Sequence, residues 1–303
     1  MKYSGLYFIS NPGTSLDASL HVVNSLVNGL ESHFPFATRQ NPWSLIHRLL
    51  RSVPPPAAKP DAGNAPLPAL THQHVLGLSY LSQSQTYCYI QTSTSTPSSQ
   101  PPHNQVVKGE PVSRAATPQP AHDAASSASS PGTIISIPTA QSESHIALLA
   151  THLSALWTFR QTLQIPQGIT YHVGQFVIRV GEIRASRSGA QSGSVLSPGV
   201  VCCITTVAGT SDDIDGEGYE TEFDSGHTSV TEDGRMEDED EDENVDLDDA
   251  EKLIRGFWET LREGMDFGRA EVREVMMGKH GLKGNGQKEA VVRMWGEVLK
   301  LRG

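Results

Sequence analysis

Hydrophobic residues follow a strand-like period at the start of the chain and a helical period directly after it. Residues 3–9 form a short apolar run that predicts a strand, and the turn-forming residues 11–13, Asn-Pro-Gly, end it. The next apolar residues recur three or four positions apart, at Leu16, Leu20, Val23, Val27 and Leu30. This spacing places them on one face of a helix over residues 15–32. We therefore expect a strand followed by an amphipathic helix.

Between the first helix and position 137 the pattern shows one unassigned apolar stretch, one hairpin and one short β run. An apolar stretch at residues 43–50 is followed by three prolines, residues 54–56, which lack the backbone N–H that regular structure needs. Residues 74–81 and 86–91 alternate around a Ser/Gln turn, which predicts a hairpin. Residues 133–137 form another short β run that Pro138 closes.

A long helix is predicted over residues 142–163. Its apolar residues fall on one broad stripe over roughly five to six turns at 3.6 residues per turn. The residues of the stripe are Ile146, Leu149, Leu153, Leu156, Trp157 and Leu163. Because this stripe is wider than a surface helix needs, we expect the helix to pack against a large apolar surface.

Residues 168–186, GITYHVGQFVIRVGEIRAS, have the strongest strand pattern in the chain. Apolar residues alternate in one phase before Gly174 and in the opposite phase after Gln175. They are Ile169, Tyr171 and Val173, and then Phe176, Ile178 and Val180. Since strand side chains alternate with period two, the change of phase indicates either a bulge or a reversal. Glycine at the first position of a two-residue loop suits a type II′ turn, so we expect a hairpin.

Three further elements are expected after the hairpin. Residues 199–207, GVVCCITTV, predict a strand that is apolar on both faces and is therefore buried or flanked. Residues 249–265 and 287–301 each carry apolar residues at helical spacing, which predicts two closing helices. The pattern as a whole predicts strands gathered around helices.

Long polar stretches separate these elements. Residues 54–70, 92–131 and 209–247 are predicted disordered insertions, because their composition offers too little apolar surface to offset the entropy of ordering them. We therefore expect a single domain over residues 1–303 that these insertions interrupt.

The acidic charge is concentrated in one insertion. Residues 212–249 hold 19 acidic residues against Arg235, a local charge of -18, whereas the whole chain carries -11, so the other residues together carry +7. Neither the net charge nor the pI of 5.5 therefore identifies a partner. The basic residues are spread over several elements without a known nucleic-acid-binding signature, so direct sequence-specific binding to DNA is not expected.

The sequence offers no catalytic, cofactor or metal set. It lacks a G-x-S-x-G elbow, and its 12 histidines are scattered without a matching acidic partner motif. The three cysteines, Cys88, Cys202 and Cys203, have no C-x-x-C spacing, which favours a reducing compartment. Cys202 and Cys203 are neighbours on a predicted strand and so point to opposite faces, which predicts core residues rather than a thiol site.

Two short motifs fall in the acidic insertion. Residues 213–224 approximate a calcium loop, but the flanks lack helical pattern and position 12 is Asp224 rather than a bidentate glutamate. Residues 224–229 have the form of a phosphorylation-dependent degradation signal around Ser225 and Ser229. The alternative for both is a solvated acidic linker, which is the default expectation for such a run.

The order of the predicted elements and the hairpin resemble the family of Mediator subunit 20. The closest match is Gly168-Ile169-Thr170-Tyr171 followed by residues 176–181, Phe-Val-Ile-Arg-Val-Gly. It resembles the family's G-x-x-Y and D-F-[LV]-[VI]-[KR]-[VI]-G pattern. Gln175 stands where the family often has Asp, and a turn tolerates either residue. The signature residues of the hairpin are Gly168, Tyr171, Gly174, Phe176, Ile178, Val180 and Gly181.

The resemblance implies an α+β fold, an antiparallel β-barrel-like sheet with packed helices, and a non-enzymatic role. It implies a nuclear coactivator subunit in the head module of Mediator that forms a heterodimer with Mediator subunit 18. It also implies tethering through Mediator subunit 8 and indirect contact with the RNA polymerase II machinery. The partner interface stays unknown at this stage. The alternative from another class is a small-ligand-binding β-barrel protein or a barrel hydrolase, because closed sheets can hold a ligand cavity.

Overall fold

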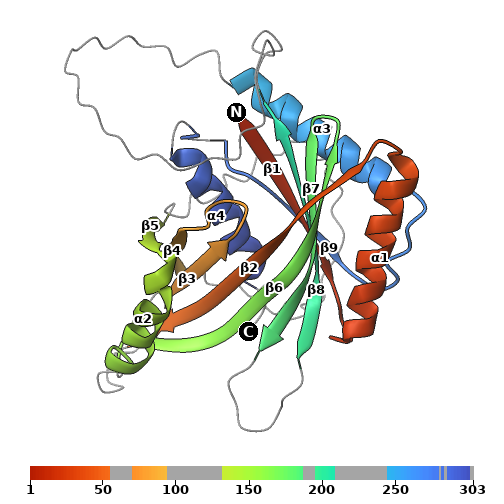
Figure 1. Cartoon of the computed structure of the whole chain (residues 1–303). Helices are drawn as coiled ribbons and strands as arrows, with labels where there is room; N and C mark the ends of the chain where they lie inside the picture. The colour runs from red at the N-terminus through yellow and green to blue at the C-terminus, as the bar shows by residue number, and fades with distance from the viewer. Residues whose placement is uncertain are drawn as a thin grey trace, which may run out of the picture.

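The computed structural model describes residues 1–54, 70–93, 132–186, 195–208, 244–279, 281–282 and 285–300. Within these ranges the elements form one antiparallel sheet with helices on both sides (Figure 1). The strands are β1 (Lys2–Ser10), β2 (Thr38–Ser52), β3 (Leu70–Leu78), β4 (Gln85–Ser93), β5 (Thr133–Pro138), β6 (Trp157–Val173), β7 (Phe176–Ser186), β8 (Leu196–Val207) and β9 (Val272–Met276). The α-helices are α1 (Leu16–His33), α2 (Ser142–Ala147), α3 (Asn244–Arg262) and α4 (Gly286–Leu299).

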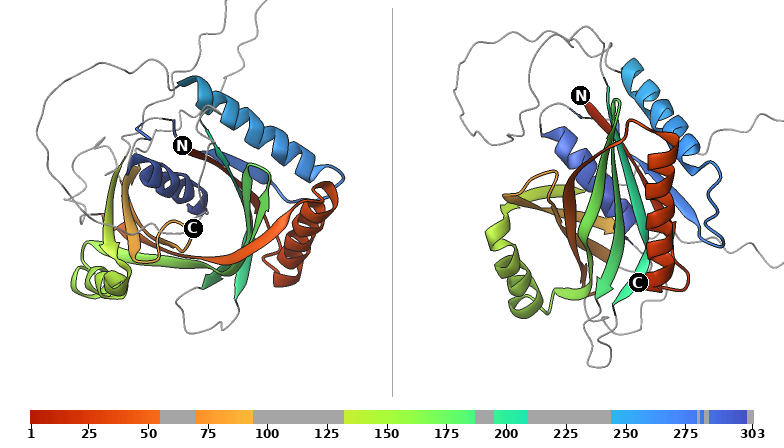
Figure 2. Two further views of the ribbon diagram at one scale, coloured as in Figure 1. Left: turned by 45° about the horizontal axis from the view of Figure 1, so that its top comes forward. Right: turned by 45° about the vertical axis from the view of Figure 1, so that its right-hand side comes forward.

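The sheet has the strand order β5-β4-β3-β2-β6-β7-β8-β1-β9, and each neighbouring pair is antiparallel. It curves strongly, and Figure 2 shows α4 lying inside the curve. Helices α1 and α3 lie on the outer side of the sheet, and α2 lies on the outer side near its other end (Figures 1 and 2). The predicted α+β fold with an antiparallel, barrel-like sheet is therefore confirmed.

Helix α4 is buried on most of its circumference. The sequence pattern predicts one apolar face, but the buried residues also include Ala290, Met294 and Gly296 beside the predicted Trp295 and Val298. A helix that is apolar nearly all round belongs in a core. The inner side of the sheet, which α4 fills, is consequently one part of the main hydrophobic core, and the buried faces of α1 and α3 on the outer side belong to the same cluster.

The interior strand β8 explains the apolar run of residues 199–207. It pairs with β7 on one side and β1 on the other, and residues Val200 to Thr206 are all buried. Its even-numbered and odd-numbered side chains face the two helical layers, so both faces need apolar residues.

The predicted helix over residues 142–163 is wrong beyond its first turns. A short 3-10 turn (Thr139–Gln141), α2 and a π-helical turn (Leu148–His152) form one helical run, and β6 begins at Trp157. Strand β6 pairs with nearly all of β2, from Ser52 opposite Trp157 to Thr38 opposite His172. Apolar residues at 157, 159, 163 and 165 also fit a period of two, and pairing with β2 and β7 satisfies this backbone.

The sequence pattern also missed β9. Residues 272–276 follow α3 and pair with β1, where the sequence suggested only a loop between the two closing helices. The predicted insertions fall mainly outside the described residues and stay predictions. No helix in the described part is both long and apolar enough to cross a membrane.

Candidate functional site

The signature hairpin forms as the phase change predicts. Val173 of β6 pairs with Phe176 of β7, which leaves Gly174 and Gln175 as a two-residue loop. Gly174 has a φ of 56°, and among the described non-glycine residues only Thr14 has a positive φ. A positive φ at the first loop position alone is the sign pattern of a type II′ turn.

One face of the hairpin holds the outer helices. Tyr171 donates a hydrogen bond of 2.5 Å to Glu31 of α1, and Phe176 packs on Phe257 of α3 with ring centroids 4.6 Å apart. Between them Ile178 and Val180 are fully buried. Burial and the neighbouring Glu31 carboxylate raise the pKa of Tyr171 to about 12, so its hydroxyl stays a donor. This face of the hairpin therefore packs against α1 and α3.

The opposite face of the hairpin leaves room for an indole. A Cβ atom at Gly168 would lie 2.2 Å from Nε1 of Trp43, and one at Gly181 would lie 3.0 Å from another atom of the same ring. Real Cβ atoms do not approach a neighbour within 3.0 Å, so Gly168 is required for Trp43 to keep this position. At Gly181 the closest contact would be with Cγ2 of Ile165, at 2.7 Å, so glycine is required there mainly because of Ile165. Trp43 in turn contacts Trp295 of α4, with ring centroids 5.7 Å apart.

Arg179 belongs to the same inner face. Its guanidinium lies over the ring of Tyr80, 4.0 Å from the centroid, a cation–π arrangement. The Tyr80 hydroxyl accepts a hydrogen bond of 2.7 Å from Nε1 of Trp295. The inner face of the hairpin is therefore linked to Trp295 of α4 through the rings of Trp43 and Tyr80. The sequence pattern predicted Trp295 only as part of the apolar face of the last helix. Its contacts with Trp43 and Tyr80 were not predicted, because they join segments far apart in the chain.

A buried histidine pair lies on the inner side of β2 and β3. Nε2 of His47 and Nδ1 of His74 are 3.0 Å apart, and both residues are 0% exposed. Burial lowers the pKa of His47 well below its usual range, and burial together with Lys300 and His72 lowers the pKa of His74 to about 3. Both rings are consequently neutral, and one donates its N–H to the other.

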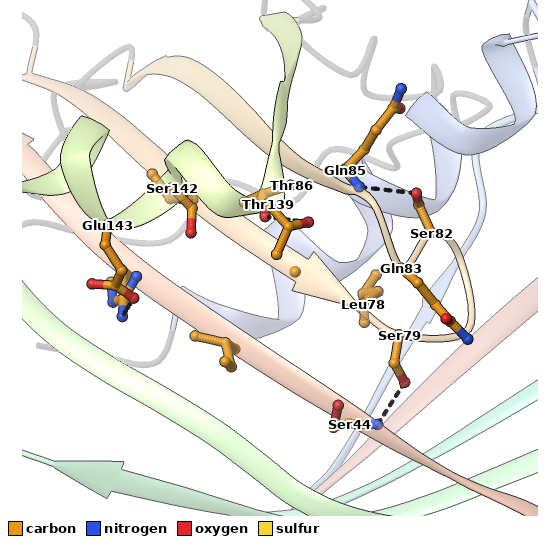
Figure 3. A pocket seen from close by; sticks show the side chains of 14 residues that line it. Ser44, Leu78, Ser79, Ser82, Gln83, Gln85, Thr86, Thr139, Ser142 and Glu143 are labelled. Carbon is orange, nitrogen blue, oxygen red and sulfur yellow. Dashed lines mark hydrogen bonds and ion pairs between the residues drawn. The ribbon is translucent and has the colours of Figure 1, made fainter. Parts of the chain in front are cut away.

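A shallow pocket of about 240 Å³ lies on the outer side of β2, β3 and β4, beside the start of α2 (Figure 3). Its polar groups already bond one another: Ser79 accepts from the Ser44 backbone N–H, and Arg48 is ion-paired with Glu143. Pockets that bind small ligands usually measure roughly 300–1,000 Å³. The pocket therefore offers little support for a ligand site.

The cysteines occupy core positions. Cys202 and Cys203 are fully buried on opposite faces of β8, and burial raises the pKa of both thiols. Cys88 is also buried, and its pKa is raised to about 11. A raised thiol pKa lowers the fraction of reactive thiolate. No group of three His, Cys, Asp or Glu residues that could hold a metal ion occurs in the part of the chain that the structure describes. The calcium-like loop, Ser225 and Ser229 lie outside that part.

Replacing Gly168 with alanine is expected to lower the free energy of unfolding by about 1–3 kcal/mol, because the new methyl group would displace Trp43. Gly256 is the matched control, since it is an exposed position of α3 with nothing near its Cβ position. Gly256→Ala is expected to be neutral or stabilising by up to about 1 kcal/mol. Urea unfolding of both variants measures the difference. Equal stability of Gly168→Ala and the native chain would contradict the tight packing.

The histidine pair is expected to make stability depend on pH. Each ring is neutral when folded and takes up a proton when unfolded, so stability is full above about pH 6.5 and falls as the pH drops toward 3. The slope is at most about 1.4 kcal/mol per pH unit for each histidine. The stability advantage of the native chain over His74→Leu should therefore shrink between pH 7.5 and pH 4.5. A difference in the free energy of unfolding between the two proteins that stays constant over this pH range would contradict the prediction. His21→Gln, at an exposed position of α1, is the control.

The comparison with known proteins agrees with the hairpin signature. A family model described as the TATA-binding related factor (TRF) of subunit 20 of the Mediator complex matches residues 1–272. The match covers β1 through α3 and includes the whole hairpin. The chain matches none of the curated proteins with which it was compared. The family belongs to Mediator and acts in the regulation of transcription. Because the match spans 272 of 303 residues, the chain belongs to the family of Mediator subunit 20.

Proposed function

We propose that the chain is a non-enzymatic subunit of the Mediator head module that regulates RNA polymerase II transcription in the nucleus. It acts by protein association, as a heterodimer with Mediator subunit 18 that Mediator subunit 8 tethers to the other head-module subunits. The observation that carries this proposal is the family match over residues 1–272, which contains the signature hairpin. The specific partners follow from the family resemblance.

The chemistry of the described residues supports a role without catalysis. The buried ionisable groups are held in their neutral, unreactive forms, as His47, His74 and Cys202 illustrate. The polar side chains of the pocket beside α2 serve the local turns and an ion pair. The seven signature residues of the hairpin pack against α1, α3 and Trp43 or form the turn, so we propose that their role is structural.

The outer surface supports a role in association. Several large apolar side chains are exposed on the described surface, among them Leu20, Phe36, Ile135, Leu148 and Leu156. Single exposed apolar residues are ordinary, but together with two open sheet edges they give partner proteins places to bury surface.

The alternative, a ligand-binding barrel or barrel hydrolase, gains no support from the inner side of the sheet. Helix α4 fills that side, and Trp295 and Val298 are 0% exposed. A ligand cavity on the inner side of the sheet would require α4 to be displaced from it.

Co-expression with Mediator subunit 18 tests the proposal. We expect a one-to-one complex that survives size-exclusion chromatography, and we expect deletion of residues 212–243 to leave folding and the complex nearly intact if that run is a solvated linker. The readouts are complex mass by light scattering and the melting temperature. If the chain is soluble, carries a small molecule in native mass spectrometry and does not bind Mediator subunit 18, the result favours a ligand-binding barrel or barrel hydrolase.

A further inference from the structure

The two edges of the sheet differ in chemistry. In the part of the chain that the structure describes, β5 and β9 are the edge strands. Strand β9, VREVM, carries Arg273 and Glu274, and Glu274 is ion-paired with Arg255 of α3. Strand β5, TIISIP, carries three isoleucines and no charge. Charged side chains are one device that protects a free edge, and β5 lacks the charges that β9 has; its protection is limited to its short length and Pro138.

The backbone of β5 leaves hydrogen-bonding groups at this edge. The N–H of Thr139 donates to Ser84 on the β4 side at 2.8 Å. Because backbone groups alternate in direction along a strand, residues 135 and 137 also point toward β4, and residues 134, 136 and 138 point away from it. The outward set therefore contains the N–H groups of Ile134 and Ser136. Pro138, which has no N–H, occupies the third outward position, where a proline is tolerated.

The side chains of β5 extend two apolar clusters to the edge. Ile137 packs on the small outer cluster of Leu50, Val75, Cys88 and Leu149, and Ile134 packs on the main core. Ile135 pairs with Cys88 of β4 but remains 50% exposed. A strand laid along β5 would cover this exposed isoleucine and continue the outer cluster.

We propose that β5 receives an extended segment of another Mediator subunit, which adds a tenth strand to the sheet. The segment is uncharged and rich in β-branched residues, and its apolar side chains lie on the face of Ile135 and Ile137. Main-chain hydrogen bonds to Ile134 and Ser136 supply affinity, and the isoleucines supply specificity. The inference rests on the proposed function, since it needs a partner subunit.

The short edge favours another subunit over a second copy of this chain. Two β5 strands from separate copies would join through few hydrogen bonds, because β5 has only six residues and Pro138 lacks an N–H. A segment of a subunit that is already held elsewhere in the complex binds at a high effective concentration, so a short edge suffices.

Recovery of Mediator subunits on the tagged full-length chain tests the proposal. Ser136→Pro removes one outward N–H and leaves the β4-facing groups in place, whereas Ser136→Ala keeps the N–H. We expect Ser136→Pro to lower the recovery of at least one subunit more than fivefold, and we expect Ser136→Ala to recover it normally. Equal recovery with Ser136→Pro overturns the proposal. If the native chain recovers no Mediator subunit, the proposed function itself fails, and the edge inference fails with it.

Hydrogen exchange on the native chain is a second test, which does not depend on correct folding of the Ser136→Pro variant. In the free chain the amides of Ile134 and Ser136 should exchange freely while those of Ile135 and Ile137 are protected. In the assembled complex we expect exchange at Ile134 and Ser136 to slow at least tenfold. Unchanged exchange in the complex overturns the proposal, and so does protection in the free chain together with a dimeric mass, which would identify a second copy as the occupant.

Discussion

The packing of α4 against the inner face of the sheet is the contact on which the rest of this structure depends. Trp295 is fully buried there between Trp43 and Tyr80, and its indole N–H is satisfied by the Tyr80 hydroxyl. A curved sheet exposes an apolar inner face that something must cover, and here the C-terminal helix of the same chain covers it. Gly296 belongs to the same contact, since a Cβ atom there would lie 2.8 Å from the ring of Tyr89.

The outer helices complete a three-layer arrangement around the hairpin. On the outer side Tyr7 of β1 stacks on Trp258 of α3 at 4.2 Å, and Tyr171 of β6 holds α1. The hairpin of β6 and β7 therefore lies between α4 on one side and α1 and α3 on the other. Its apolar signature residues Ile178 and Val180 are fully buried, and Tyr171 and Phe176 contact the outer helices, so packing accounts for this part of its residue pattern.

Much of this fold could be predicted from local pattern. The first strand, α1, the hairpin at Gly174 and the two closing helices are confirmed, because their periods and turn residues agree with their tertiary surroundings. The helix predicted to Leu163 is wrong, since Trp157 and Leu163 fit a helical and a strand period equally and pairing with β2 decides between them. Strand β9 was missed because five residues have little pattern without β1 beside them.

The site residues also divide into those that a local sequence pattern predicts and those that depend on contacts between distant segments. The turn at Gly174 could be predicted because a change of phase is a local signal. The need for glycine at 168, however, depends on Trp43, more than 120 residues earlier in the chain. The neutral pair of His47 and His74 likewise forms only when β2 and β3 pair. The sequence contains no local pattern for such contacts.

Urea unfolding of Trp295→Ala tests most directly whether α4 holds the sheet. The account predicts a loss of about 3–5 kcal/mol in the free energy of unfolding, because the indole fills the centre of the inner core. Leu156→Ala, at a position that is 58% exposed, is the control and should change stability by less than about 0.5 kcal/mol. A Trp295→Ala protein that unfolds within about 1 kcal/mol of the native chain would contradict the central role of this helix.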